Sequence, residues 1–369
     1  MKVVIQSLTI SLIGAMVSLS TSIAAPVISE IVAINDGSLV DKDGDTSAWV
    51  EIYNTSTDPI DLKGHYATDN PENPTKFLIP TLRVPGESHA LLYLSDKDFS
   101  SLFDPEVHAS FTFGIKDDYF AIISPDGSTI VDALENIENR LGMSYGRENP
   151  ESSEGTLFSQ QTPLAPNINP VAGVVADTKF SVDRGFFTEP FQVEITTATE
   201  GARILYSTSG RAPNEGTIFT GPIEHVYDGP VTISETTVLR AAAFKDGLGP
   251  SNVDTQTYIF ASDVGQQEEM TGRDADHPQM VEALTSIPTI SLAVEDLEDV
   301  TIGGDRGIDN DEEFQTSVEL LHPDGTEGFQ IDAGVSRFGG YFTNFEKESF
   351  RLHFRKRYGA ARLEYPLYR

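Results

Sequence analysis

Short runs of β-branched and aromatic residues, separated by turn clusters, constrain the fold of this chain more than any other feature. Between Pro26 and Asp132 the runs show partial alternation of apolar and polar residues, which is typical of half-buried strands. Turn-forming sequences such as NDGS, DKDGD and SPDGS lie between them. The predicted strands are VISEIVAI, WVEIYN, HALLYL, FTFGI and YFAIIS. This pattern predicts a β-sandwich.

The rest of the chain divides into further units by composition. Residues 147–179 are rich in Pro, Ser, Asn and Gly, which indicates a partly ordered linker. A second group of short strands follows, and a third group begins at IPTISLAVE. The expected organisation is a leader at 1–25, a sandwich at 26–146, a linker at 147–179, a second sandwich at 180–260, an acidic polar linker at 261–286 and the N-terminal part of a further domain at 287–369. The predicted fold class is mainly β, with two immunoglobulin-like sandwiches in tandem before the incomplete start of an α+β domain.

The first 25 residues have the features of a secretory signal peptide. Lys2 supplies a positive start, an apolar stretch follows, and STSIAAP ends in small residues. A transmembrane anchor is the alternative, but Ser and Thr interrupt the apolar stretch. No later stretch is long and apolar enough to span a bilayer. We therefore expect a secreted or cell-surface protein without a transmembrane segment in its mature chain.

Charge and cysteine content narrow the classes of partner. The chain has 57 Asp and Glu against 25 Lys and Arg, a net charge of −32, and no cysteine. Such an acidic protein is not expected to bind nucleic acid or anionic membranes. Without disulfides, an exported chain depends on packing and on bound ions for its stability.

The sequence DKDGD at 41–45 has two interpretations. Asp41, Asp43 and Asp45 match the acidic positions of an EF-hand loop, but Thr46 stands where that loop has glycine and Ile52 where it has glutamate. A calcium site of another type remains open, because the three aspartates concentrate hard oxygen ligands on one turn. The alternative is a β-turn in which the glycine takes a positive φ.

The only tryptophan of the chain follows this turn. Alternation along the predicted strand points Val50 and Ile52 one way and Trp49, Glu51 and Tyr53 the other. An aromatic platform for sugar is one possibility, and a tryptophan packed in the core is the favoured one.

The first unit resembles the lamin-tail domain of bacterial exported proteins. The resemblance rests on SEIVAIND, on WVEIYNTSTDPIDLKGHYATD and on the later FGIKDDYFAIISPDGSTIVDAL, MSYGR and TPLAPN, and covers roughly residues 26–168. It implies an immunoglobulin-like sandwich that acts as a scaffold or interaction module without catalysis.

The second unit is similar to the small chitobiase C-terminal-type sandwich, a module that accompanies catalytic domains. The similarity is carried by the stretch that starts at FSVDRGFFTEPFQVEITT and by TVLRAAAFKDGLGPSNVDTQTYIF. The central pattern Y-[ST]-x-D-G-x-x-P is present from Tyr206 to Pro213, but Ser209 replaces the aspartate. We expect the turn to survive, since Gly210 and Pro213 remain.

The third unit resembles the opening of a CotH-type kinase domain. The resemblance rests on FQIDAGVSRFGG, on KESFRLHFRKRYG and on LEYPL. It favours phosphate binding by the basic stretch, with Arg337, Lys347 and Arg351 as candidate nucleotide-binding residues. The alternative is a charged outer face paired with acids such as Glu346, Glu348 and Glu364. The aspartate-based centre of that family lies further along, so Mg-ATP is implied only for a domain completed downstream.

These patterns predict modules rather than a catalytic centre. The chain has no HExxH, no GxSxG and no cysteine nucleophile. We therefore expect a non-catalytic surface protein whose sandwiches bind a protein, cell-wall or extracellular-matrix partner. The alternatives are an extracytoplasmic ATP-dependent kinase of CotH type and a carbohydrate- or matrix-binding adhesin.

Overall fold

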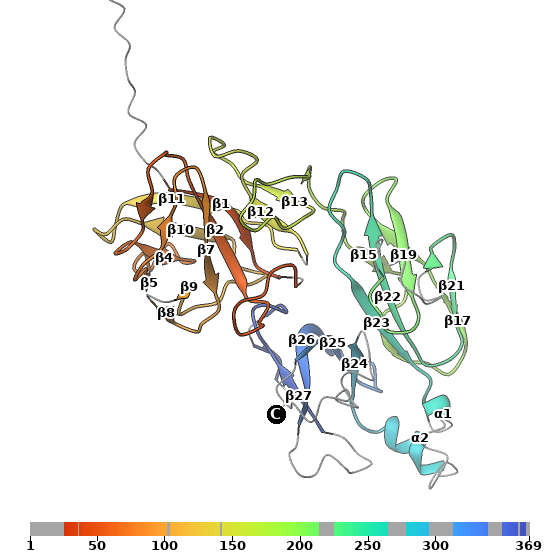
Figure 1. Ribbon diagram of the computed structural model, residues 1–369. Coiled ribbons are helices and arrows are strands. Elements are labelled where there is room, and N and C mark those ends of the chain that lie inside the picture. Colours follow the sequence, from red (N-terminus) through yellow and green to blue (C-terminus); the bar gives the residue numbers. More distant parts are fainter. Residues whose placement is uncertain are drawn as a thin grey trace, which may run out of the picture.

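The computed structural model is mainly β, with three successive groups of sheets (Figure 1). The tandem arrangement of sheets confirms the predicted fold class. The leader lies outside the described residues, which are 26–35, 37–101, 104–140, 142–213, 225–264, 278–294, 313–338, 349–360 and 362–366.

Two facing sheets form the first unit. The larger has the order β14 (Pro170–Val171), β13 (Thr156–Phe158), β12 (Ser144–Gly146), β1 (Pro26–Val32), β2 (Ala48–Asn54), β7 (His89–Leu94), β9 (Asp104–His108), β8 (Phe99–Ser101). The smaller has the order β11 (Ile130–Glu135), β10 (Tyr119–Ile123), β4 (Tyr66–Thr68), β5 (Phe77–Leu78). A short pair joins β3 (Ile60–Asp61) to β6 (Arg83–Val84). The segment 147–179 thus adds β13 and β14 to the edge of this sandwich.

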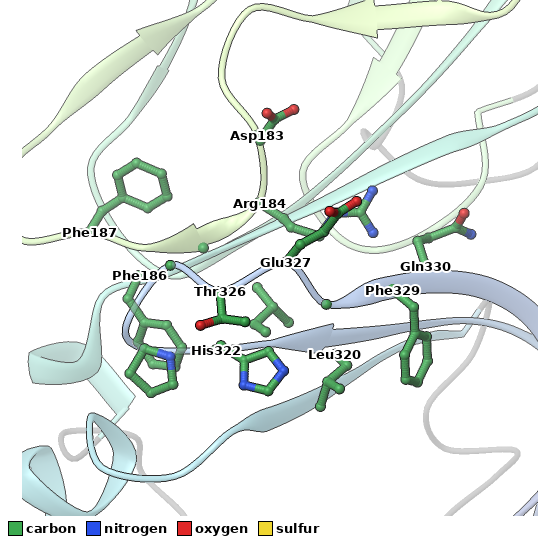
Figure 2. Close-up of a pocket in the computed structure, with 15 residues that line it drawn as sticks. Asp183, Arg184, Phe186, Phe187, Leu320, His322, Thr326, Glu327, Phe329 and Gln330 are labelled. Atoms are coloured by element: carbon green, nitrogen blue, oxygen red, sulfur yellow. The ribbon is translucent and has the colours of Figure 1, made fainter. Parts of the chain in front are cut away.

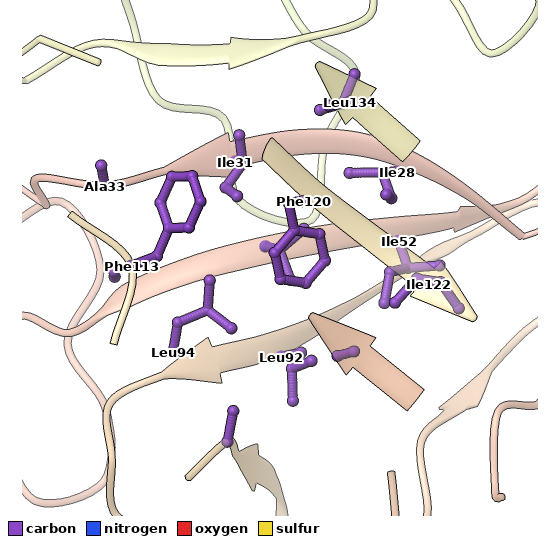
Figure 3. Packing of buried hydrophobic residues seen from close by; sticks show 14 of the residues in the cluster. Ile28, Ile31, Ala33, Ile52, Leu92, Leu94, Phe113, Phe120, Ile122 and Leu134 are labelled. Carbon is purple, nitrogen blue, oxygen red and sulfur yellow. The ribbon is translucent and has the colours of Figure 1, made fainter. Parts of the chain in front are cut away.

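Alternate residues of the strands build the core between the two sheets. Ile31, Ile52 and Leu92 project from the larger sheet toward Phe120 and Ile122 of the smaller one (Figure 3). All five are fully buried. Burying each such side chain contributes about 1.5–3 kcal/mol, so this layer is the main source of stability in the first unit.

One predicted strand of the first unit is a bend instead. FTFGI, residues 111–115, forms only an isolated bridge between Ser95 and Thr112. Phe111 and Phe113 are nevertheless buried in the core. Their apolar side chains indicate burial but not strand geometry. The prediction of a strand at 111–115 from this short apolar run was therefore wrong.

Two buried carboxylates lie side by side on the outer face of the larger sheet. Glu30 and Glu51 are directly opposite each other in the pairing of β1 with β2, and both are 0% exposed. The Thr162 N–H donates to Glu30 at 3.1 Å, and the Leu164 N–H donates to Glu51. The Ser29 hydroxyl donates to Glu51 at 2.7 Å. Both glutamates therefore hold the segment 162–164 against the sheet.

The second unit follows directly. Its main sheet has the order β16 (Gly185–Phe186), β23 (Asp254–Ile259), β22 (Thr237–Phe244), β19 (Arg203–Ser207), β20 (His225–Val226). Two strand pairs complete it, β15 (Thr178–Phe180) with β18 (Ile195–Thr197) and β17 (Phe191–Val193) with β21 (Val231–Ile233). Tyr258 lies at the centre of its core, with the rings of Phe187 and Phe191 at 5.6 Å and 5.2 Å.

The third unit is one antiparallel sheet of four strands, drawn in blue below and between the other two in Figure 1. Its order is β24 (Thr289–Val294), β25 (Phe314–Leu321), β26 (Phe329–Phe338), β27 (Ser349–His353). The helices α1 (Ala261–Val264) and α2 (Pro278–Leu284) lie on the chain between the second and third units.

The carboxylate pair predicts how stability depends on pH. Burial, reinforced by the neighbouring Glu30, raises the pKa of Glu51 from its ordinary value of 4.5 to about 8. Between these two values the unfolded chain has lost a proton that the folded chain keeps, so the free energy of unfolding falls as pH rises and levels off above about 8. We expect Glu51→Gln to abolish this loss, which is on the order of a few kcal/mol. Urea titrations at several pH values measure it.

Glu72→Gln, an exposed change in the same unit, is the matched control and is expected to keep the wild-type pH slope. A Glu51→Gln protein with that same slope would contradict the assignment.

Candidate functional site

The DKDGD sequence forms a tight turn around one buried aspartate. Asp41 Oδ1 accepts hydrogen bonds from the backbone N–H groups of Asp43 and Asp45, both at 3.0 Å. The Gly44 N–H donates to the Asp41 carbonyl at 2.9 Å, and Gly44 has a φ of 86°. The predicted turn with a positive φ at glycine is confirmed.

A lysine ammonium lies among the three carboxylates of this loop. One ligand oxygen from each of Asp41, Asp43 and Asp45 lies within 4.8 Å of the others, which is close enough to hold one ion. Lys97 Nζ is 2.6 Å from Asp41 and 2.8 Å from each of Asp43 and Asp45. The structure therefore brings the three predicted metal ligands together, with Lys97 as their counter-ion.

Hydrogen bonding keeps this ammonium charged. Partial burial alone lowers the pKa of Lys97, but the hydrogen bonds that its ammonium donates to the carboxylates outweigh this effect and raise the pKa above its usual range. Asp41 is 0% exposed at its side chain, whereas Asp43 and Asp45 are 51% and 61% exposed. A calcium ion at this loop has to displace Lys97 from the buried Asp41.

The candidate nucleotide-binding arginines do not converge. Arg337 is opposite Phe350 in the pairing of β26 with β27, whereas Arg351 is opposite Ser336. Because neighbouring residues of a strand point to opposite faces, Arg337 and Arg351 project from opposite sides of the sheet. The Arg351 guanidinium lies 4.4 Å from the ring centre of Phe338. Lys347 lies outside the described residues.

The same sheet carries a hydrogen-bonded chain that the sequence did not predict. The Ser336 hydroxyl lies 2.7 Å from His353 Nε2, and His353 Nδ1 lies 3.2 Å from Glu313. Glu313 also binds Arg355 at 2.5 Å and Arg357 at 2.6 Å. Ser336 is 1% exposed, so its hydroxyl does not face a substrate. We interpret these hydrogen bonds and ion pairs as a structural network that connects the start of β25 to β26 and β27. These residues are brought together by the register of the strands.

A buried carboxylate joins the third unit to the second. Glu319 on β25 is 0% exposed and lies 2.7 Å from Arg184. The Thr257 hydroxyl of β23 donates to Glu319 and lies 2.8 Å from the Ser291 hydroxyl of β24. Burial raises the pKa of Glu319, while Arg184 and Thr257 favour its charged form. Removal of any one partner would leave a polar group without compensation at this joint.

A lysine joins the third unit to the first. Lys356 Nζ donates to both carboxylate oxygens of Asp117, at 3.0 Å and 2.9 Å, and lies 3.5 Å from Asp69. The Ile115 N–H donates to the Lys356 carbonyl at 3.2 Å. A Cβ on Gly114 would lie 2.5 Å from that carbonyl oxygen, so the close approach requires glycine. Both sandwiches therefore contact the third sheet.

A groove of about 680 Å³ lies where the second and third units meet. Figure 2 shows the segment that carries Asp183 and Phe186 facing the turn between β25 and β26. That turn supplies His322 and Glu327, and β26 supplies Phe329. Aromatic rings, hydrogen-bond donors and hydrogen-bond acceptors thus line one groove.

Comparison with known proteins identifies one module. Residues 182–255 match the family model of the chitobiase/beta-hexosaminidase C-terminal domain. This match supports the predicted similarity of the second unit to that domain. No curated protein matches the chain.

Neither α1 nor α2, nor any other helix in the described part of the chain, has the length and apolar character needed to cross a bilayer.

The geometry of the acidic loop predicts its response to calcium. We expect Lys97→Gln to bind calcium at least tenfold more tightly than the wild-type chain, because the ion no longer competes with a lysine ammonium held by three carboxylates. Calorimetric titration with calcium measures the difference. Asp43→Ala in the Lys97→Gln background is the control and should weaken binding again. Equal affinities of the wild-type and Lys97→Gln chains would show that the ammonium does not occupy the ion position.

Proposed function

We propose that this chain is an exported, modular surface protein whose two β-sandwich units serve as non-catalytic interaction, spacer or anchoring modules for the third unit. The lamin-tail-like and CotH-like resemblances of the first and third units are part of this proposal. So are its location outside the cytoplasm and a protein, cell-wall or matrix partner.

One observation carries the proposal: each sandwich holds the third sheet through its own polar joint. Lys356 with Asp117 makes the joint to the first unit, and Glu319 with Arg184 makes the joint to the second. The first joint adds a backbone hydrogen bond and the close approach at Gly114 to its charges, and the second contains a fully buried carboxylate, so both differ from exposed surface ion pairs. Contacts of both sandwiches with the third unit are consistent with a role of the sandwiches in positioning that unit.

The match of residues 182–255 supports the same conclusion, because it assigns a large part of the second unit to a C-terminal module and not to a catalytic domain. Sandwich modules of this kind present loops and edges for binding while their cores carry the stability.

The binding hypothesis has a direct test. We expect the region 26–260 to bind isolated cell wall, matrix proteins or a surface protein in a sedimentation assay, and not to consume ATP. A glycan array with the full chain, which keeps both sides of the groove in Figure 2, tests the carbohydrate alternative that the aromatic rings and carboxylates of this groove favour. Absence of binding to every one of these surfaces would contradict an anchoring role.

The kinase alternative stays a prediction. Arg337 and Arg351 lie on opposite faces of their strands, and Lys347 lies outside the described residues. Phosphate oxygens would have to be bound by one of these arginines without the other.

The contact between the first and third units can be tested by a substitution at Gly114. We expect Gly114→Ala to separate the two units locally, because the added methyl group would overlap the backbone of Lys356. Hydrogen exchange should then increase in residues 355–358 and 114–117 while the core strands β1 and β2 stay protected. Gly229→Ala is the control, since a Cβ there meets no atom within 4 Å. Unchanged exchange in the Gly114→Ala chain would mean that the joint is not held by this contact.

A further inference from the structure

A cavity of about 410 Å³ lies where all three units meet. Ile34, Ile115 and Arg140 line it from the first unit. The second unit contributes residues of β22 and of the segment 250–253, and the third contributes residues of β25 and β26 and Tyr358. Ligand sites of proteins are commonly found at such interfaces, with volumes of about 300–1,000 Å³.

The wall of the cavity is mainly apolar, with a few polar groups. Phe244, Pro250 and Val253 of the second unit face the same space as Ile34 and Ile115 of the first. Three polar residues, Gln315 and Ser317 of β25 and Asn252, also line it. This composition suits a ligand with an apolar body and one polar group.

The charges at the cavity are positive on balance. Arg140 and Arg240 line it together with Asp332. Burial raises the pKa of Asp332, which disfavours its negative charge, although Arg240 opposes this effect. Arg240 also donates to the Gly210 carbonyl at 3.0 Å, so part of its hydrogen-bonding capacity is used within the protein.

Arg140 differs from Arg147 and Arg184 in its partners. Its Nη1 donates to the Asn139 carbonyl at 2.9 Å, its Nε is buried without a partner, and no carboxylate among the described residues makes an ion pair with it. By contrast, Arg147 is paired with Asp132 and Arg184 with Glu319. In a chain with 57 acidic residues and 25 Lys and Arg, a half-buried guanidinium without a carboxylate is unusual.

We propose that this cavity binds a small monocarboxylate with an apolar body, whose carboxylate pairs with Arg140. The guanidinium offers parallel N–H groups that match the two oxygens of a carboxylate. A single anionic group fits Arg140, which makes no ion pair with a carboxylate of the described residues, and an apolar body fits the wall. A phosphate would bring more charge into a mainly apolar space, at a larger desolvation cost.

Binding at this place would also join the three units. The ligand contacts residues of each of them, so it stabilises the arrangement in which they meet over any arrangement in which they separate. The cavity would thereby link the presence of a small carboxylate to the rigidity of the whole chain.

Benzoate is a suitable probe, because it combines a planar carboxylate with a compact apolar ring. We expect calorimetric titration of the full chain to show benzoate binding, and benzyl alcohol, its neutral counterpart, to bind at least tenfold more weakly. Arg140→Gln should lose benzoate affinity by about tenfold or more, whereas Arg83→Gln, an exposed change in the first unit, should keep it.

Val253→Trp provides a second variant that keeps Arg140 and fills the cavity from the second unit, and it should also abolish benzoate binding. Benzoate that fails to bind the wild-type chain, or that binds Arg140→Gln or Val253→Trp as tightly as wild type, would overturn the proposal. Binding of inorganic phosphate in place of benzoate would overturn the assignment to carboxylates.

Discussion

Buried carboxylates hold together segments that lie far apart in this chain. Glu30 accepts hydrogen bonds from Thr162, 132 residues away, and Glu51 accepts one from Leu164, 113 residues away. Glu319 does the same between the second and third units through Thr257, 62 residues away. Because the chain has no cysteine, these contacts and not disulfides connect the distant segments. The placement of the segment 162–164 and of the third sheet depends on them.

The ion pair of Asp132 shows why buried carboxylates determine which segments pair more than they increase the net free energy of unfolding. Asp132 binds Arg147 through two nearly parallel hydrogen bonds of 2.6 Å and 3.0 Å, and accepts the Ile28 N–H at 2.6 Å. The donors offset the cost of taking the carboxylate out of water. Replacing a whole buried pair by apolar groups is often neutral, whereas removing one partner costs about 3–5 kcal/mol. The network therefore favours one arrangement of strands over its competitors.

Local patterns in the sequence predicted the strands and the turn of the first unit well. Alternation separated Val50 and Ile52 from Trp49, Glu51 and Tyr53 without showing which side faces the core, and the structure places Val50 and Ile52 in the core between the sheets. Trp49 was expected in the sandwich core. It is fully buried, but in a separate small cluster with Val32 and Tyr93 on the other side of the sheet, because the alternation of the strand directs Val50 and Ile52 to the core instead. The strands β13 and β14 carry too few apolar residues to be recognised from periodicity, and they form because the edge of the sheet is next to them.

Contacts between residues far apart in the sequence could not be predicted from local patterns. Nothing near DKDGD indicates that Lys97, 56 residues from Asp41, provides its counter-ion. The opposite faces of Arg337 and Arg351 follow from the register of β26 with β27, which residue spacing alone does not fix. The chain from Ser336 through His353 to Glu313 depends on that register too.

Positively charged side chains are few in this protein, so the contacts of each partly buried one are informative about the fold. With many more carboxylates than cations, a lysine or arginine that is partly buried has a choice of partners, and its position marks where the fold concentrates negative charge. Lys97 marks the acidic loop, Lys356 the joint between the first and third units, and Arg184 the joint between the second and third. Arg140 lies among the same units but pairs with no carboxylate of the described chain. The proposed carboxylate ligand would give Arg140 the kind of partner that the other three cations have within the protein.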